Sequence, residues 1–512
     1  MKISKIPYQK TNRFNQLVVD YLDQKEELLR FVNSFPNIEN FEKQIKLKKE
    51  QNIDRSLLHE VLQDQNNNLK LSDICLKNLK LINKESTFTI TTGHQLSLFT
   101  GPLYFIYKII STINLVKKLK EHYSEYDFVP IFWLASEDHD FEEINSINIY
   151  NNKIKWERNY QGPVGKIELD NINDLISQVN ELISKNENSD QIIELLEKSY
   201  LPNYNLAEAT RHIINNIFGD YGLLILDGND VRLKNKLVDV IDKDINNNIF
   251  YDIINKTNSD LSKNYHIQAH VRPINFFKIS DKKRERITTK VDSKDIYSNP
   301  QNYSPNVLLR PIYQEMILPN VAYIGGGSEI SYWLQLKDVF NHLNLTYPIL
   351  VLRNSVLILD DHQKKKIEKL GLSACDFFES VDIVNKNYLM QLDEHIDFQD
   401  DIKNLESLFL KIEEKLKDQN LISSLRALNK KTLNSFNDFE KKAIKNLKFK
   451  KENDIAKIKK LRDMLFPNNQ LQERHENFIS MYLKFGDNFI KNLYSSLNPL
   501  DPNFVILELE SK

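Results

Sequence analysis

Two stretches, STFTITTGHQ (86–95) and DFVPIFWLASEDHD (127–140), decide the fold. The first is β-branched and extended until Gly93 breaks it, and the second is apolar on both faces, as a buried parallel strand is. Between them, Thr100-Gly101-Pro102 precedes apolar residues at helical spacing, which predicts a helix of about five turns. Strand, helix and strand together predict a βαβ unit with a right-handed crossover.

The same alternation returns later in the chain. A helical pattern near 205–218 precedes the strand GLLIL (222–226). VAYI (321–324) and PILVL (348–352) are further apolar runs of strand length. Strands separated by helices predict an α/β fold with a Rossmann-like, doubly wound parallel sheet. Ligands of such sheets bind outside the carboxyl ends of the strands.

Other segments depart from this rhythm. Residues 1–82 carry apolar stripes at helical spacing, which predicts helices that wrap the core. Two interruptions have short strands of their own and are candidate lids over the site. The predicted organisation is a core of 1–150, 203–260 and 305–395, insertions at 151–202 and 261–304, and a helical domain with a C-terminal tail at 396–512.

Apolar side chains recur at three- and four-residue spacing from about residue 400 onward, among lysines and glutamates. Sustained over several heptads, this spacing predicts an antiparallel helical hairpin or coiled coil. Such an arm is either a solvated projection or a handle for homodimerisation, and we expect a homodimer. The apolar positions are Ile402, Leu405, Leu408, Ile412, Leu416, Leu421, Leu425, Leu428, Phe436, Phe439, Ala443 and Leu447.

Composition restricts the partners. The 512 residues include 69 basic and 71 acidic side chains, so no overall field favours nucleic acid or an anionic membrane. The N-terminus lacks the apolar segment of a secretory signal, and no apolar run is long enough to span a bilayer, which predicts a cytoplasmic protein. Cys75 and Cys375 stand alone, so neither a disulfide framework nor a metal site is expected from them.

The loop after the first strand is a candidate site. Gly93 permits a sharp turn, after which polar side chains point over the next helix, whose N-terminus near Gly101 offers N–H groups to an anion. The alternative is an ordinary strand-to-helix turn with a satisfied, buried histidine. The candidates are His94 as a catalytic residue and Thr92, Gly93, Gln95, Tyr104 and Lys108 as substrate-binding residues.

The loop after the second strand is acidic. Glu137, Asp138, His139 and Asp140 end a wholly apolar strand, so their charges must be paired, bind a cation or meet a substrate ammonium group. One of them could act as general base towards an attacking amine, and others could hold Mg²⁺. The alternative is a solvated acidic turn that caps the next helix.

Two later loops end at the same edge of the sheet. The segment from Gly325 to Glu329 resembles an anion-binding loop, or anion cradle. The alternative is a glycine-rich turn without a ligand. The candidate ligand contacts are Gly326, Gly327, Ser328 and Glu329. Arg353 follows the next strand and could clamp a carboxylate or phosphate. Asp227 is a candidate for a ribose hydroxyl.

Taken together, these motifs resemble the bacillithiol-biosynthesis family BshC over nearly the whole chain. The segments that carry the resemblance are TGHQLSLFTGPLYFIYK (92–108), VPIFWLASEDHDFEEIN (129–145), GPVG (162–165), LLILDGND (223–230), LRPIYQEMILPNVAYIGGGSEISYWLQL (309–336) and MLFPNNQLQER (464–474). The family's first loop is commonly TGQQ, so His94 is a departure.

The resemblance implies a Rossmann core with connecting-peptide insertions, and a coiled-coil domain used for dimerisation. It also implies a ligase that adds L-cysteine to glucosaminyl-malate in the last step of bacillithiol synthesis. By analogy with class I aminoacyl-tRNA synthetases, whose HIGH and KMSKS signatures are absent here, we expect ATP to activate the carboxyl group. A nucleotide would bind either in the crevice or near Gln472 and Arg474.

Two rival hypotheses remain at this stage. One is a metal-dependent hydrolase or deacetylase whose ion is bound by His94, Asp138, His139 and Asp140. The other is a non-enzymatic nucleotide-binding scaffold with the helical arm as its working part.

Overall fold

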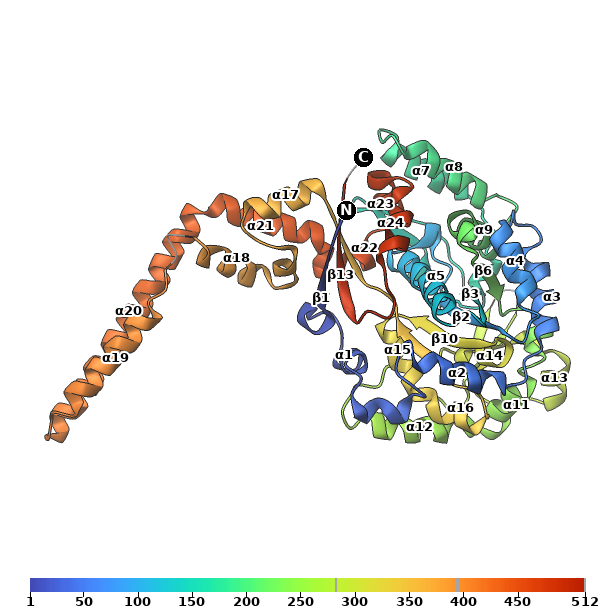
Figure 1. Cartoon of the computed structure of the whole chain (residues 1–512), viewed down its shortest axis with the longest axis horizontal. Coiled ribbons are helices and arrows are strands. Elements are labelled where there is room, and N and C mark those ends of the chain that lie inside the picture. Colours follow the sequence, from blue (N-terminus) through green and yellow to red (C-terminus); the bar gives the residue numbers. More distant parts are fainter. Residues whose placement is uncertain (281–282, 393–395, 511–512) are drawn as a thin grey trace. The chain divides into compact units, whose positions relative to one another are not determined.

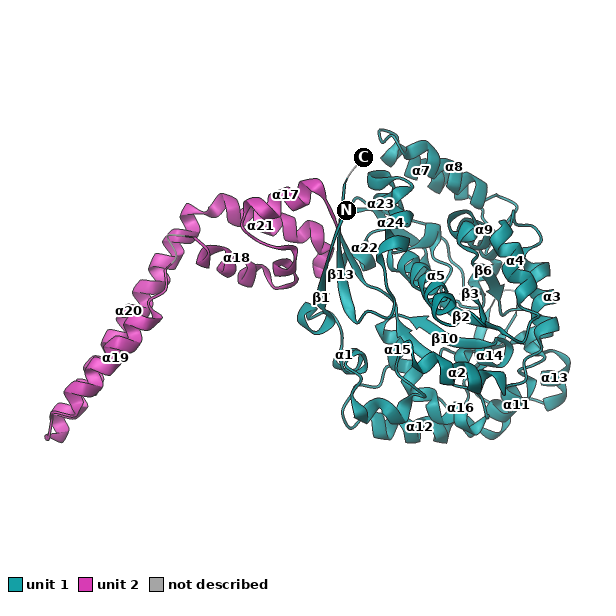
Figure 2. Ribbon diagram, in the orientation of Figure 1, with its two compact units in different colours: residues 1–358, 471–512 teal, residues 359–470 magenta. Residues whose placement is uncertain are grey.

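The computed structural model describes residues 1–280, 283–392 and 396–510. The chain forms two compact units (Figure 2), of which the first comprises residues 1–358 and 471–512 and the second residues 359–470. None of the helices in the described ranges combines the length and the apolar character that a membrane crossing requires.

A five-stranded parallel sheet forms the centre of the first unit, and the predicted Rossmann-like α/β fold is confirmed. The strand order reverses between β2 and β10, because the chain builds outward first on one side of β2 and then on the other. The order across the sheet is β11 (Ile349–Leu352), β10 (Asn320–Gly325), β2 (Thr87–His94), β3 (Asp127–Leu134) and β6 (Leu224–Asp227).

The central strand β2 is unusually polar, and its neighbour explains why. The hydroxyls of Thr89 and Thr91 both donate to Asn320 Oδ1 on β10, at 3.3 and 2.9 Å. Thr92 donates to the carbonyl of Ile324 at 2.8 Å. These three buried hydroxyls each have an acceptor, which lowers the desolvation penalty of a polar strand in the middle of the sheet. The hydroxyl of Thr87, at the start of β2, has no hydrogen-bond partner among the described residues.

Helices cover both faces of the sheet (Figure 1). Helix α5 (Tyr104–His122) packs on β2 and β3, and it is buried along most of its length. Helix α3 (Arg55–Asn66) packs on β6, and α2 (Asn40–Lys49) packs on β10. The helix predicted after Pro102 is therefore the crossover between the first two strands.

A second sheet joins the two ends of the chain, in the order β1 (Lys2–Pro7), β13 (Asn503–Leu509) and β12 (Val356–Asp360). Strands β1 and β13 run antiparallel, with Lys2 opposite Glu508. The expectation that residues 1–82 are helical is therefore wrong for β1. The C-terminal tail ends in a strand, β13, and packs in the first unit. The pairing of β1 with β13 joins residues at opposite ends of the chain, and no local periodicity in the sequence indicates such a contact.

The predicted insertions carry short strands, as expected. The first contains β5 (Asn152–Lys155), which pairs with β4 (Ser146–Ile149), followed by α7 (Ile172–Ile183) and α8 (Ser189–Ser199). The second forms a three-stranded antiparallel sheet in the order β8-β7-β9. Its strands are β7 (Phe276–Ile279), β8 (Arg284–Arg286) and β9 (Tyr303–Pro305).

The second unit is helical, and the predicted coiled-coil hairpin is confirmed. Near its base the rings of Phe398 and Phe439 stack at 5.9 Å, and near its tip Arg426 pairs with Glu413 at 2.6 Å. The unit spans residues 359–470, so it begins before the predicted start at residue 396 and ends before the predicted C-terminal tail. Its helices are α17 (Asp361–Lys369), α18 (Val381–Met390), α19 (Gln399–Glu413), α20 (Gln419–Lys450) and α21 (Glu452–Leu465).

A fully buried ion pair joins α2 to α14 (Arg310–Ile317) beneath the sheet. Lys48 Nζ lies 3.3 Å from Glu315 Oε2, and both side chains are 0% exposed. Glu315 Oε1 also accepts hydrogen bonds from Gln314 and Asn320, at 2.8 and 2.7 Å. Burial of two charges is tolerated here because each is paired and hydrogen-bonded.

Replacement of Lys48 by Met should lower the free energy of unfolding by about 3–5 kcal/mol, because it leaves a buried carboxylate without its cation. The matched control is Lys46→Met on the same helix, whose pair with Glu42 is exposed. That variant should lose less than about 1 kcal/mol. Urea titration measures both, and equal losses in the two variants would contradict the assignment.

Candidate functional site

A cavity of about 640 Å³ opens at the carboxyl ends of β2, β3 and β10, where the strand order reverses. All five predicted catalytic residues line it. The predicted substrate-binding residues also line it, with the exception of Thr92, and so does Arg474. The convergence expected from strand order alone is therefore present in the folded chain.

The side chains of Thr92 and Gln472 form hydrogen bonds within the protein and do not line the cavity. The hydroxyl of Thr92 is committed to β10, as described above. Gln472 is 4% exposed, and its side chain bonds both backbone groups of Ile358, at 3.0 and 3.1 Å. An amide satisfied in this way holds β12 in place, so the structure does not support its prediction as a nucleotide contact.

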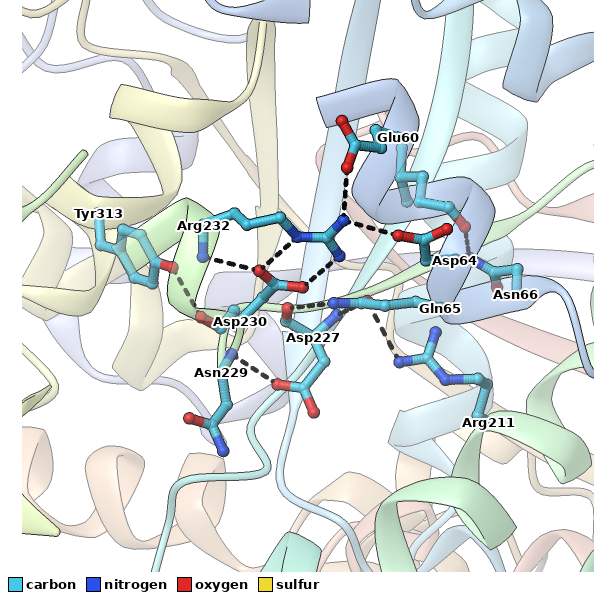
Figure 3. Close-up of polar contacts among 12 residues, drawn as sticks. Glu60, Asp64, Gln65, Asn66, Arg211, Asp227, Asn229, Asp230, Arg232 and Tyr313 are labelled. Carbon is cyan, nitrogen blue, oxygen red and sulfur yellow. Dashed lines mark hydrogen bonds and ion pairs between the residues drawn. The ribbon is translucent and has the colours of Figure 1, made fainter. Parts of the chain in front are cut away.

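Asp227 does not line the cavity either. Its carboxylate accepts hydrogen bonds from Ser136 Oγ at 2.5 Å and from the backbone N–H of Asn229 at 2.8 Å. Figure 3 shows the surrounding network, in which Gln65 bonds both backbone groups of Asp227. Asp227 thus ties the loop after β6 to the loop after β3, and the predicted ribose contact is not supported.

Lys108 and Glu329 form an ion pair across the switch point of the sheet, with Lys108 Nζ 2.6 Å from Glu329 Oε2. Lys108, which is 2% exposed, also donates to the carbonyl of Gly93 at 2.5 Å. Glu329 accepts from Tyr323 Oη at 2.5 Å and from Gly326 N at 2.8 Å. The predicted anion cradle is therefore filled by the chain's own carboxylate.

The N–H groups of Gly101 and Leu103 already have acceptors, and neither residue lines the cavity. Gly101 N donates to the carbonyl of Leu98, Leu103 N donates to the carbonyl of Glu476, and the carbonyl of Gly101 accepts from Asn477 Nδ2. The entry to α5 thus packs on the C-terminal segment of the same unit.

His94 contributes a neutral imidazole. Burial and the nearby charge of Lys108 lower its pKa to about 3. Its ring packs edge-on against Tyr104, with centroids 5.2 Å apart. Nε2 is shielded from solvent and has no hydrogen-bond partner among the described residues. His94 can therefore offer a hydrogen bond, but it carries no charge at neutral pH.

The acidic loop divides into paired groups. Glu137 is bonded to Lys234, whose side chain is fully buried and also donates to the carbonyl of Tyr303 at 2.6 Å. The ion pair holds the Glu137 carboxylate in a fixed position. Glu137 therefore connects the β3 loop to the second insertion through Lys234.

Asp138 is the ionised carboxylate that faces the cavity. It accepts hydrogen bonds from Gln95 Nε2 at 2.9 Å and from the backbone N–H of His139 at 2.8 Å. Burial raises its pKa, but the His139 and Gln95 hydrogen bonds and the charge of Arg284 outweigh burial and lower it to about 2. A group with so low a pKa accepts a proton poorly, yet it binds an ammonium group well.

Asp138, His139 and Asp140 bring three potential metal-ligand atoms within 4.8 Å of one another. Arg284 lies against this group, with Nη1 3.0 Å from His139 Nδ1 and 3.6 Å from Asp138 Oδ1. A fixed guanidinium there opposes a second cation. The fit for Mg²⁺ or for a hydrolytic metal ion is therefore poor.

Arg353 is less available to a ligand than predicted. Its Nη2 pairs with Glu473 at 2.7 Å, and its Nη1 donates to the carbonyl of Asn354 at 3.0 Å. Both side chains of the ion pair are almost completely buried. Although Arg353 lines the cavity, its charge is neutralised within the protein.

Several cavity residues escaped the sequence analysis. The second insertion and the segment after it supply arginines at positions 272, 284, 286 and 310, and aromatic walls come from Trp133, Tyr313, Tyr323 and Tyr332. A basic run at 284–286 was the one local signal. His270 also lines the cavity.

Asp244 on α11 (Val238–Asn247) holds the second insertion in place. The backbone N–H of Asn275 donates to it at 2.5 Å, and Asn275 Nδ2 donates at 3.1 Å. Asn275 in turn bonds Arg272 and Asn306, which line the cavity. Asp244 is 0% exposed, and burial raises its pKa from 3.8 to about 7.

This raised pKa has a measurable consequence for stability. Folded Asp244 holds its proton more tightly than the unfolded chain does, so its contribution is present below pH 3.8 and is lost as the pH rises to about 7. Relative to Asp244→Asn, wild-type stability should fall by up to about 1.4 kcal/mol per pH unit within this window.

Urea unfolding at several pH values between about 5 and 8 tests this slope. The control is Asp239→Asn, an exposed position of the same helix, which should keep the wild-type slope. A wild-type slope in Asp244→Asn would show that another group titrates.

Comparison with known proteins agrees with the fold and with the motifs. Residues 1–354 match "Bacillithiol biosynthesis BshC, N-terminal Rossmann-like domain", and residues 356–509 match "Bacillithiol biosynthesis BshC, C-terminal coiled-coil domain". A Flavobacterium johnsoniae protein named "Putative cysteine ligase BshC" is 39% identical over 98% of this chain and 99% of its own length.

Further relatives carry the same name. Those of Flavobacterium psychrophilum and Cytophaga hutchinsonii are 40% and 33% identical, over 98% and 97% of this chain and 99% and 97% of their own lengths. A solved Campylobacter jejuni structure titled as an arginyl-tRNA synthetase aligns with a TM-score of 0.24 at 14% identity, over 83% of this chain and 97% of its own, which is too slight to inform fold or activity. The two matched domains and the full-length relatives place this chain in the BshC family of bacillithiol biosynthesis.

Proposed function

We propose that this protein is a cysteine ligase that forms an amide bond between L-cysteine and the amine of glucosaminyl-malate. The relatives are named as cysteine ligases of this family. The observation that carries the proposal is the cavity at the switch point, which presents ionised Asp138 and a set of arginines to the same space. An amine and carboxylates are the groups that such a site would bind.

The proposed reaction is ATP-dependent. A carboxylate oxygen of cysteine attacks a phosphorus atom of ATP and displaces ADP or pyrophosphate. The sugar amine then attacks the activated carbonyl carbon, the C–N bond forms, and the C–O bond to the phosphoryl or adenylyl group breaks. The amine proton is released to solvent. Mg²⁺ would bind together with the nucleotide, because Arg284 already lies against the carboxylate of Asp138 that could otherwise hold the ion.

Each cavity group has a proposed role in this scheme. Asp138 orients the amine and stabilises the positive charge that develops on its nitrogen, in keeping with a pKa of about 2. This role replaces the general-base role that the sequence predicted for one residue of the acidic loop. Neutral His94, through the unsatisfied Nε2, hydrogen-bonds the activated carboxyl group. Gln95 holds Asp138 and bonds Glu143 at 2.9 Å.

We further propose a cytoplasmic homodimer formed through the helical hairpin. No side chain of α19 is buried, and apolar residues such as Leu408, Leu421 and Phe439 are more than half exposed. An apolar stripe on such an arm is suited to pairing with a second copy.

An assay with purified protein, L-cysteine, glucosaminyl-malate, ATP and Mg²⁺ tests the ligase. We expect a cysteine-containing amide by mass spectrometry and stoichiometric cleavage of ATP. Asp138→Asn should lower kcat by at least about tenfold, because the charge that stabilises the transition state is lost. Asp54→Asn, on the exposed surface, should retain wild-type turnover. Unchanged product formation by Asp138→Asn would overturn the role of Asp138.

Deletion of the encoding gene tests the pathway step in cells. Glucosaminyl-malate should accumulate and bacillithiol should disappear, because in the proposed scheme this ligase catalyses the reaction that consumes the precursor. Thiol and precursor profiling of the deletion strain measures both. An unchanged profile would remove the ligase hypothesis, and complementation with the wild-type gene is the control.

A further inference from the structure

The charges that line the cavity do not balance one another. Lys108 pairs with Glu329, Arg284 lies against Asp138, and Arg353 pairs with Glu473. The remaining guanidinium groups of the wall have no ion pair with a carboxylate in the described ranges. These are Arg272, Arg286, Arg310 and Arg474.

Arg310 differs from the other three because it is partly buried, whereas they are exposed to solvent. Exposed guanidinium groups are hydrated and need no partner. A charge withdrawn from water without a counter-ion is costly, so Arg310 is the cation of this wall that gains most from an incoming anion.

The surroundings of Arg310 hold its guanidinium in one orientation. Nη1 donates to Gln314 Oε1 one turn further along α14, at 2.9 Å. The guanidinium carbon lies 5.4 Å from the ring centroid of Tyr323 and 5.9 Å from that of Trp133. Nη2 is shielded from solvent and has no hydrogen-bond partner among the residues described. Burial lowers the pKa of this guanidinium, but its neighbours, which include the Tyr332 hydroxyl and the charge of Glu329, outweigh burial and raise the pKa. The group is thus fixed in position, while its Nη2 remains without an acceptor among the described residues.

We propose that Arg310 is the residue that binds a carboxylate group of the substrate. This inference rests on the proposed function and adds the residue that recognises the acid. A planar guanidinium fork matches the two oxygens of a carboxylate. The cavity is less suited to bind a phosphate group. The backbone N–H of Gly326 already donates to Glu329, and Lys108 already forms an ion pair with Glu329.

Both proposed substrates carry carboxylates, so the source of the bound group must be resolved by experiment. Isothermal titration calorimetry of the full-length protein with L-cysteine, cysteamine, L-malate and inorganic phosphate distinguishes them without requiring turnover. Cysteamine lacks the carboxylate of cysteine and serves as its matched control. The variants are Arg310→Gln, Arg310→Lys and, as an exposed cation outside the cavity, Lys236→Gln.

We expect Arg310→Gln to weaken binding of L-cysteine or L-malate by at least about tenfold, the size of a charge-assisted hydrogen bond. Arg310→Lys should also bind more weakly than wild type, because it keeps the charge but lacks the fork. Loss of the preference for cysteine over cysteamine identifies cysteine as the source, and loss confined to L-malate identifies the malyl group. Lys236→Gln should bind as wild type.

Three outcomes would overturn the proposal. They are wild-type affinity for both acids in Arg310→Gln, a loss confined to phosphate, and no binding of either acid to the wild-type protein at millimolar concentration. Thermal melting without ligand shows whether Arg310→Gln folds, and if it does not, the Lys variant decides. Arg310-dependent acid binding in a protein that makes no amide would refute the proposed function and leave the carboxylate site intact.

Discussion

The ion pair between Lys108 and Glu329 connects the parts of the molecule on which the site depends. Lys108 lies on the crossover helix α5 and reaches the carbonyl of Gly93 at the end of β2, while Glu329 closes the loop after β10. Two strands that are neighbours in the sheet but distant in the chain are thereby joined at the switch point. A pair of this kind offsets its desolvation only because further hydrogen bonds satisfy both groups.

This arrangement changes the chemistry available at the switch point. The loop at 325–329 has the glycines of an anion cradle. However, Glu329 itself accepts the hydrogen bond of the Gly326 N–H group and forms the ion pair with Lys108. In our proposal, recognition of an anion therefore falls to groups that remain unpaired, above all Arg310. Arg353, by contrast, is held by its ion pair with Glu473.

The second insertion completes the cavity and supplies three of its arginines, Arg272, Arg284 and Arg286. It is held through Asp244 and Asn275 on one side and through Lys234 and Glu137 on the other. Because Lys234 bonds the carbonyl of Tyr303, the same buried cation fixes the insertion and the acidic loop of β3. The acidic loop and the second insertion are thus parts of one hydrogen-bonded network, which favours a cavity assembled before any ligand binds.

The sequence by itself determined the parallel sheet, the crossover helix, the meeting of loops 92–95, 137–140 and 325–329, and the helical hairpin. These features follow from local periodicity, and from the rule that parallel strands present their carboxyl ends at one edge. Only the tertiary structure decided that β1 pairs with β13 and which charges are consumed by partners far along the chain. Whether a charged side chain is free depends on what lies within a few ångströms of it. Arg310, Arg353 and Lys108 are surrounded by segments that are distant in the chain. Local sequence patterns do not predict that these segments lie close together.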